Sequence, residues 1–475
     1  MINSRRANIA LVCAIAMTML TTGCKVGPNY TRPSVPAPPE YRGEENDRTA
    51  NSSAPQTASL GDQKWWEFFA DPQLQALIRK GLQQNFDIRV AAERVVEAEA
   101  QLGVTKADQL PSLTGTGSYT SQRYSKGALG NTDPTLINQG SLGLSATWNL
   151  DFWGKYRRAT EASRAQLLSY EWARRAVLTT VVMDIATDYF QLRTLDLQLE
   201  IATKALASRK DTLRLTQALE AGGKDTLLDV QEAEQLVFTA QQEIPDLERQ
   251  IEQQEDSLCT VLGENPHPIA RGLAIDHQPH LPVVPAGIPS TLLERRPDIR
   301  EAEQNLIAAN AEIGVARAAY FPQISLTGSA STQTNALSRL FTGPSYAWNY
   351  GPSLTVPIFD AAKNRNNVRI SESEERQSLL TYQQTIASAF RDVSKALVAY
   401  QKYREYREQQ EGLVNSTRNA TQLSHARFEQ GQSAYLEVLT NESNYLSADL
   451  NLATARQNEL LSLVQLYNAL GGGWQ

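Results

Sequence analysis

The sequence has few cysteines and few histidines. Its three cysteines in 475 residues cannot form a disulfide framework. Cys13 and Cys24 lie in an N-terminal apolar segment, so Cys259 is alone in the body of the chain. A lone cysteine in an apolar helical stretch is most often a small buried hydrophobe, which is what we expect of Cys259.

Three of the four histidines, His267, His277 and His280, lie in a proline-rich loop. No cysteine joins them and their spacing matches no established metal site, which favours a solvated loop over a metal centre. Gly115-Thr116-Gly117 lies in a strand pattern, so it does not form a phosphate-binding loop. We therefore expect no catalytic residue, no metal and no cofactor, and an enzyme is the least favoured function.

Strong charge and long apolar runs are also missing. Lys+Arg number 45 against 52 Asp+Glu, a net charge of -7, which disfavours a nucleic-acid partner. After residue 24 no apolar run reaches the ~20 residues of a transmembrane helix.

The N-terminus has the pattern of a targeting segment. Arg5 and Arg6 precede an apolar stretch over 7–20. The following Leu20-Thr21-Thr22-Gly23-Cys24 resembles a bacterial lipobox, with threonine where leucine is usual. We expect cleavage after residue 23 and a covalent lipid such as palmitate on Cys24. An ordinary signal peptide is the alternative, but Gly-Cys at the end of the apolar stretch favours the lipoprotein.

The chain contains an internal duplication. One set of residues recurs at an offset of 208 (431 − 223) and a second set at 211 (314 − 103), which indicates a repeated structural unit. The first set is Leu215, Gly223, Leu228, Asp229, Val230, Leu262 and Gly263 with Leu423, Gly431, Leu436, Glu437, Val438, Leu470 and Gly471; the second includes Gly103 and Pro111 with Gly314 and Pro322.

Each repeat contains long helical patterns. Asp71 and Pro72 predict a helix start, with Asp71 as the cap. Pro245 is expected to kink or break the helix in which it lies. Glycines predict hairpin turns at 221–225 and 430–434. The expected helices cover about 72–82, 87–107, 155–220, 226–262, 363–430 and 436–470.

Four stretches alternate apolar and polar residues with period two. Transmembrane β-strands of ~9–11 residues show this pattern, with one face to lipid and one to the lumen. A half-buried strand of a soluble sheet alternates identically, but Trp148, Trp348 and Tyr350 favour a membrane girdle. The stretches are 113–124, 141–152, 324–330 and 346–358, with outer turns at 125–139 and 334–345.

Four strands cannot close a membrane barrel, since the smallest have ~8. Open edges in lipid cost several kcal/mol for each unpaired backbone group. The chain must therefore share its barrel with other copies; two copies give eight strands and three give twelve.

Motifs spread over nearly the whole chain make it resemble the TolC-like outer-membrane efflux ducts, in the lipoprotein branch that serves tripartite resistance-nodulation-division pumps. The resemblance implies a mainly α fold with a membrane β-barrel: a homotrimer with a twelve-stranded barrel in the outer membrane, an equatorial belt and a twelve-helix periplasmic tunnel. The implied partners are a periplasmic adaptor, an inner-membrane proton-driven pump and outer-membrane lipid. The motifs are Gly27-Pro28-Asn29-Tyr30-Thr31-Arg32-Pro33, Trp65-Trp66, Glu294-Arg295-Arg296-Pro297-Asp298-Ile299, 311–322 and Leu466-Tyr467-Asn468-Ala469-Leu470-Gly471.

The expected organisation follows the repeats. A signal peptide covers 1–23 and a lipidated tether 24–63. The first repeat covers 64–266 and the second 290–475, with an equatorial linker at 267–289 between them. The membrane hairpins are expected at about 111–152 and 322–359.

The resemblance places the gate and the adaptor contact at the helix tips. Gly223 and Gly431 are adaptor-docking candidates, although the local pattern alone makes both simple helix stops. The family has a Leu followed four residues later by an Asp at the gate. Leu436 matches the Leu, Thr440 stands at the Asp position, and Glu437 and Glu442 are nearby. Without the resemblance, Leu436 would be assigned to ordinary helix packing.

Arg295-Arg296-Pro297-Asp298 is interpreted as a helix start with ion pairs, not as a catalytic motif. Three functions remain: a passive exit duct for drugs or other toxic small molecules, an exit duct for protein in a type I secretion system, and a periplasmic coiled-coil scaffold without a pore. The lipobox and the Gly-Gly-Gly-Trp ending favour the first, and strand alternation disfavours the third.

Overall fold

The structure is a computed structural model that describes residues 25–36, 38, 41, 59–123, 136–278 and 289–474. These residues form two compact units, and each unit takes segments from both repeats. The first unit holds the described residues of 1–34, 94–170 and 301–382, and the second holds those of 35–93, 171–300 and 383–475. Cys24 and the signal segment lie outside the described residues. Among the described helices, none combines the length and the apolar character needed to cross a membrane.

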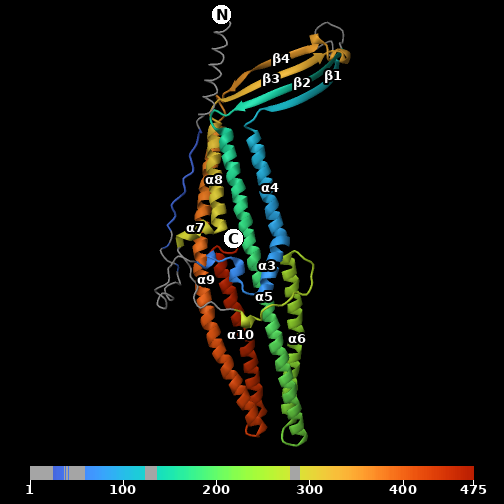
Figure 1. The fold of residues 1–475 in the computed structure, drawn as a ribbon, viewed down its shortest axis with the longest axis vertical. Helices are drawn as coiled ribbons and strands as arrows, with labels where there is room; N and C mark the ends of the chain where they lie inside the picture. The colour runs from blue at the N-terminus through green and yellow to red at the C-terminus, as the bar shows by residue number, and fades with distance from the viewer. Residues whose placement is uncertain are drawn as a thin grey trace. The chain divides into compact units, whose positions relative to one another are not determined.

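Helices dominate the fold (Figure 1). The first long one begins where the sequence predicts, because the Asp71 carboxylate accepts hydrogen bonds from the N–H groups of Gln73, at 2.8 Å, and Leu74. The α-helices are α2 (Trp65–Phe68), α3 (Pro72–Gln84), α4 (Phe86–Ala107), α5 (Lys155–Ala221), α6 (Leu227–Leu262), α7 (Leu292–Arg295), α8 (Pro297–Ala318), α9 (Lys363–Glu429) and α10 (Tyr435–Ala469).

The break expected at Pro245 does not occur. Helix α6 runs through this proline without interruption. Pro245 and Gln241, whose carbonyl loses its intrahelical donor, are both exposed. Water can therefore bond the freed carbonyl, which removes most of the reason for the helix to end there.

The four predicted strands form one antiparallel sheet in the order β1-β2-β3-β4. Strand β2 starts five residues before the alternation at 141, and β4 ends before 358, since Pro357 has no N–H to donate. The segment between β3 and β4, expected as a plain turn, contains two 3-10 turns, Leu337–Arg339 and Gly343–Ser345. The strands are β1 (Ser112–Arg123), β2 (Leu136–Leu150), β3 (Gln323–Thr334) and β4 (Tyr346–Thr355).

The register of the sheet separates two faces of opposite character. The pairs Trp148↔Leu326 and Ala330↔Trp348 lie on one face, together with exposed residues such as Leu144 and Tyr350. The other face is formed by hydroxyl and amide side chains, some of which bond across strands, as Ser118 does to Ser141 at 2.8 Å. The polar face carries Ser112, Thr114, Thr116, Ser118, Ser141, Ser145, Thr147, Ser325, Thr327, Ser329, Ser331, Asn349 and Ser353.

A buried arginine fixes the first described residues within the first unit. Arg158 on α5 is 1% exposed and donates to the carbonyl oxygens of Val26 and Gly27, each at 3.2 Å, and to Oδ1 of Asn29 at 2.8 Å. Gly27 has φ +98°, and a Cβ there would lie 2.5 Å from the Cα of Gly314. The chain just after Cys24 is therefore held in one place, next to Trp153, whose carbonyl accepts from the N–H of Val26.

The second unit is packed around aromatic rings and one buried carboxylate. Phe68 stacks on Tyr467 at 4.3 Å between ring centroids. Asp71 is 1% exposed and accepts from the Tyr189 hydroxyl at 2.8 Å and from the N–H of Leu273 at 2.9 Å. This carboxylate thus caps α3 and also holds the loop that follows α6.

Candidate functional site

The two helix tips have the same backbone geometry. Gly223 and Gly431 have φ of +69° and +70°, and in each turn the next N–H bonds the carbonyl five residues back, Lys224 to Leu219 at 2.9 Å and Gln432 to Arg427 at 2.8 Å. This is the bonding of a glycine-terminated helix, so both glycines are helix stops. A Cβ at either glycine would meet nothing within 4 Å, so both turns are open on the surface of the chain.

A small apolar cluster joins the four helices next to the tips. Phe428 of α9 and Tyr435 of α10 lie 5.6 Å apart between ring centroids and are 6% and 2% exposed. Ala233 of α6 and Val438 of α10 complete the buried part, and Leu213, Leu215, Leu219 and Leu439 pack against it. The hairpins α5–α6 and α9–α10 therefore share a core in this region.

The three gate candidates lie on the first turns of α10 with their side chains outside that core. Leu436 is 59% exposed, so the assignment to ordinary helix packing does not hold within one chain. Glu437 pairs with Arg427 across the turn at 3.2 Å. The Thr440 hydroxyl donates to the carbonyl of Leu436 at 2.8 Å, so it is turned back along its own helix.

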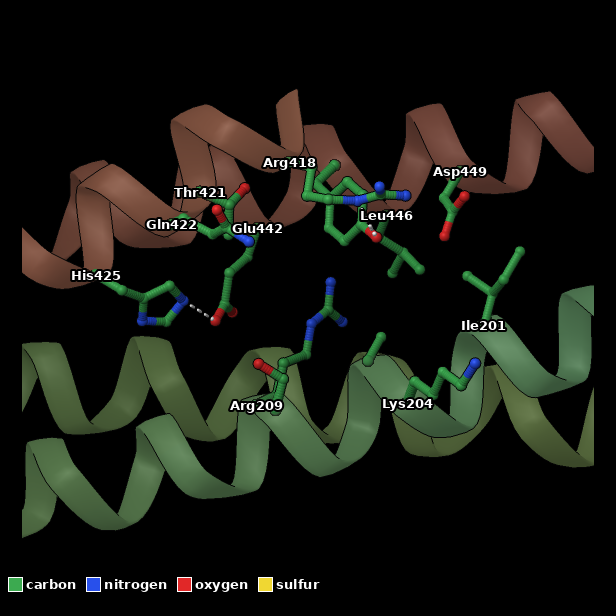
Figure 2. A pocket seen from close by; sticks show the side chains of 13 residues that line it. Ile201, Lys204, Arg209, Arg418, Thr421, Gln422, His425, Glu442, Leu446 and Asp449 are labelled. Carbon is green, nitrogen blue, oxygen red and sulfur yellow. Dashed lines mark hydrogen bonds and ion pairs between the residues drawn. The ribbon is translucent and has the colours of Figure 1, made fainter. Parts of the chain in front are cut away.

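Beside the tips lies a cavity of about 370 Å³ between the hairpins (Figure 2). His425 of α9 points to Glu442 of α10, with Nε2 2.9 Å from Oε1. The Thr212 hydroxyl of α5 lies 3.3 Å from the same oxygen. Arg209 of α5 projects into the cavity, 5% exposed, and donates from Nη1 to the carbonyl of Leu236 on α6 at 3.0 Å. The site therefore links all four helices.

Sequence reasoning noticed Glu442 only as a neighbour of the gate and missed His425 and Arg209. A signal was present, because His425 and Glu442 lie within about three helical turns of Gly431 on either side, and antiparallel pairing brings such residues to one level. Arg209 had no such signal, since its place depends on how the two hairpins pack. Burial lowers the pKa of Arg209, and the charge of Glu442 opposes this.

The remaining sequence candidates have structural surroundings. Arg296 binds the Asp298 carboxylate with two nitrogens, at 3.0 and 2.6 Å, which confirms the ion-paired helix start. Cys259 is fully buried, as predicted, with Sγ 3.3 Å from Nδ1 of His267. His280 lies outside the described residues. Within the described ranges, no group of three or more His, Cys, Asp or Glu could hold a metal ion.

Comparison with known proteins identifies the fold and the family. The sequence profile of the family described as outer membrane efflux protein matches residues 77–264 and 288–472. The cation efflux system protein CusC of Escherichia coli O6:H1 (strain CFT073) is 34% identical over 460 residues, covering 97% of this chain and 98% of CusC. The solvent efflux pump outer membrane protein SrpC of Pseudomonas putida is 34% identical over 463 residues, covering 96% and 97%. A crystal structure of CusC aligns with a TM-score of 0.83 and 33% identity, covering 95% of this chain and all of that one. The chain belongs to the outer membrane efflux protein family.

Proposed function

We propose that this protein is the outer-membrane channel of a tripartite efflux system. Three copies form a passive exit duct for toxic small molecules, which an inner-membrane proton-driven pump delivers through a periplasmic adaptor. CusC is named for cation efflux and SrpC for solvent efflux, so two relatives that are equally similar to this chain, at 34% identity, are named for different cargoes. We therefore expect the pump to select the cargo.

The sheet carries this proposal. Its apolar face exposes Leu144, Trp348 and Tyr350 at 56%, 65% and 78%, as expected of a surface that contacts lipid. Its polar face consists of uncharged hydroxyl and amide groups, which suit a water-filled lumen. A sheet in a soluble protein would gain nothing from exposing so many large apolar side chains on one face.

The free edges of the sheet favour three copies. Strands β1 and β4 each pair with one neighbour among the described strands, so each leaves an edge of unpaired backbone groups. Joining β4 of one copy to β1 of the next satisfies these groups in lipid. Two copies would give eight strands, whose interior is only wide enough for side chains, whereas twelve strands leave a channel.

The helix tips supply the gate and the adaptor contact. Leu436 is apolar and exposed on the first turn of α10, so three copies around one axis would form a constriction that excludes water. Glu437 and Thr440 would flank it, without an acidic ring at the Thr440 position. The open turns at Gly223 and Gly431 are alike in geometry, which suits an adaptor that contacts both hairpins in the same way.

The lipid on Cys24 would add a second membrane anchor. Arg158 holds Val26, Gly27 and Asn29 in the unit that contains the sheet, and the Val26 N–H bonds the carbonyl of Trp153, three residues after β2 ends. A lipid attached at residue 24 would therefore emerge close to the base of the membrane sheet.

The decisive experiment is accumulation of dyes, antibiotics and metal ions in a host that lacks its own ducts, with and without this chain and its cognate pump. We expect lower accumulation of at least one compound class when both are present, and heat-resistant trimers in detergent-extracted outer membranes. Correctly assembled trimers that export a protein substrate but change no accumulation would favour type I secretion instead. Monomers confined to the periplasm would favour the scaffold function.

A further inference from the structure

The four strands and the connection between β3 and β4 carry very little charge. Their described residues include two charged side chains, Arg123 and Arg339, and no carboxylate. Both arginines are exposed, and neither forms an ion pair with another described residue. The five N–H donors of each guanidinium group are therefore open to water or to an anion from outside the chain, and the place of the arginines in the sheet decides which.

Both arginines lie at the end of the sheet that is furthest from the helices (Figure 1). Arg123 is the last residue of β1, and Arg339 closes the 3-10 turn Leu337–Arg339 between β3 and β4. At the opposite end, β1 and β3 each follow a helix, and β2 and β4 each lead into one. In an outer-membrane duct with periplasmic helices, the two arginines therefore face the outer leaflet.

The register places Arg123 on the apolar face, beyond the aromatic side chains. Arg123 pairs with Leu136, and Tyr119, on the same face, pairs with Gly140. Trp148 lies on this face eight residues after Gly140, which is about 26 Å along the strand, or roughly 20 Å across the membrane at a tilt of ~40°. An apolar band is ~25 Å tall, so Tyr119 and Trp148 lie near its two borders. Arg123 is four residues beyond Tyr119, roughly 10 Å further out, at the depth of the lipid headgroups.

The connection that carries Arg339 is held in one shape by hydrogen bonds. The carbonyl of Arg339 accepts from the hydroxyls of Thr342, at 2.8 Å, and Ser345, at 2.9 Å, and from the N–H of Thr342 at 3.1 Å. Phe341, two residues after the arginine, is 82% exposed. A braced turn with a cation beside an exposed aromatic ring suits a membrane interface, where the ring enters the lipid and the cation stays among the headgroups.

We propose that Arg123 and Arg339 bind the phosphate groups of lipid headgroups in the outer leaflet. The proposal rests on the duct function above, since only an inserted barrel brings this end of the sheet to that leaflet. A guanidinium group donates two parallel hydrogen bonds to a phosphate, and this pairing is stronger beside a membrane than in bulk water. Joining β4 of one copy to β1 of the next also brings Arg339 of one copy and Arg123 of the next to the same seam, so a lipid bound there contacts two copies.

The test measures lipid binding to the purified full-length protein in detergent by native mass spectrometry. The probes are lipid A, a phosphorylated glycolipid of bacterial outer leaflets, and the same lipid after its phosphates have been removed. We expect wild type to prefer the phosphorylated form. Arg123→Gln and Arg339→Gln should each weaken its binding about fivefold, and the double variant about 25-fold, if each arginine acts separately. Arg123→Lys keeps the charge and should lose less than Arg123→Gln, because only the two-point contact is removed.

Two controls separate a lipid site from general charge effects. Arg391 on α9 has a side chain that is 69% exposed but lies outside the sheet, so Arg391→Gln should bind lipid A as wild type does. Inorganic phosphate at the concentration of lipid A should not displace it, because free phosphate has no acyl chains to contact the apolar face. Equal binding by wild type and the double variant, or displacement by inorganic phosphate, would overturn the inference. A failed duct function shows as missing trimers or unchanged accumulation, whereas a failed lipid site leaves both normal.

Discussion

The two tip hairpins share a turn but differ in what holds the returning helix. In the first hairpin Thr226 caps α6, accepting from the Asp229 N–H at 3.3 Å, and Leu227 is 65% exposed. The equivalent residues 208 positions later are Ala434, which makes no side-chain cap, and Tyr435, which is buried. A local hydrogen bond therefore starts α6, whereas packing against Phe428 starts α10.

The charged groups differ in the same way. His425 and Glu442 correspond to Gln217 and Glu234 in the first repeat. Gln217 is exposed and cannot titrate, so the first hairpin has no counterpart of the His425–Glu442 pair. The two repeats therefore share the backbone geometry of the turn, but only the second hairpin has a histidine paired with the glutamate. Substitutions at equivalent positions of the two hairpins can therefore separate effects of the shared turn geometry from effects of side chains that only one hairpin has.

The largest difference in stability is expected at the first residue of each returning helix. Tyr435→Ala removes a ring that is 2% exposed and should destabilise the tip by about 3–5 kcal/mol. Leu227→Ala, at an exposed position, should change stability by less than about 0.5 kcal/mol. Amide hydrogen exchange of α10 and α6 near the tips measures both. Equal effects of the two substitutions would show that the second hairpin does not depend on its packed start.

The next pair tests the gate. Leu436→Ala should make the closed duct leaky, because it shortens the apolar side chain proposed to form the constriction. Leu228→Ala changes the equivalent residue in the first repeat, which is similarly exposed, and serves as the matched control. Single-channel conductance and uptake of a large antibiotic are the measurements. If neither changes in Leu436→Ala, or if both variants leak equally, Leu436 is not the gate.

The two tip glycines should respond alike. Both have a left-handed backbone, and an added Cβ would touch nothing at either site, so the cost comes from the backbone alone. Gly223→Ala and Gly431→Ala should each destabilise their turn by about 1–2 kcal/mol. Local exchange rates should rise by a similar factor in the two hairpins. A large difference would mean that one turn is constrained by something besides its φ angle.

Hydrophobic periodicity and the positions of glycine and proline predicted the helices and strands well, because these signals depend on local chemistry. Helix α5 starts at Lys155, as expected, and the strand alternation agrees with one continuous apolar face. Of the kink or break predicted at Pro245, the break does not occur, because the freed carbonyl of Gln241 is exposed and can bond water. Whether this carbonyl is exposed depends on how the helices pack, and the sequence near Pro245 does not show it.

The candidate site was only partly predictable. The turns at Gly223 and Gly431 follow from a glycine rule and a repeat offset, both readable in the sequence. The link between His425, Glu442 and Thr212 requires three helices in register, and Thr212 is more than 200 residues from its partner. Neither composition nor spacing encodes such a contact directly.

The smallest effect should come from the helix caps. Thr226→Ala removes a cap and should destabilise the start of α6 by about 1 kcal/mol, which corresponds to roughly fivefold faster amide exchange over 227–230. Its hydrogen bond also lowers the pKa of Asp229, so this stabilisation is present at neutral pH and is lost as the pH falls through that lowered pKa. The variant should therefore weaken this acid dependence without abolishing it, since the backbone N–H of residue 226 still donates to the Asp229 carboxylate.

Ala434→Thr is the reciprocal substitution, which adds a hydroxyl at the uncapped start of α10. The gain should be smaller than the loss at Thr226, for two reasons. Glu437, which would complete the cap, is already paired with Arg427, and burial of Tyr435 already holds the first turn. The contrary result would be a larger effect at the second hairpin: a slowing of amide exchange over 435–438 in Ala434→Thr that exceeds the acceleration over 227–230 in Thr226→Ala. The stability of the second hairpin would then be limited by its missing cap. Packing would then not be what starts α10.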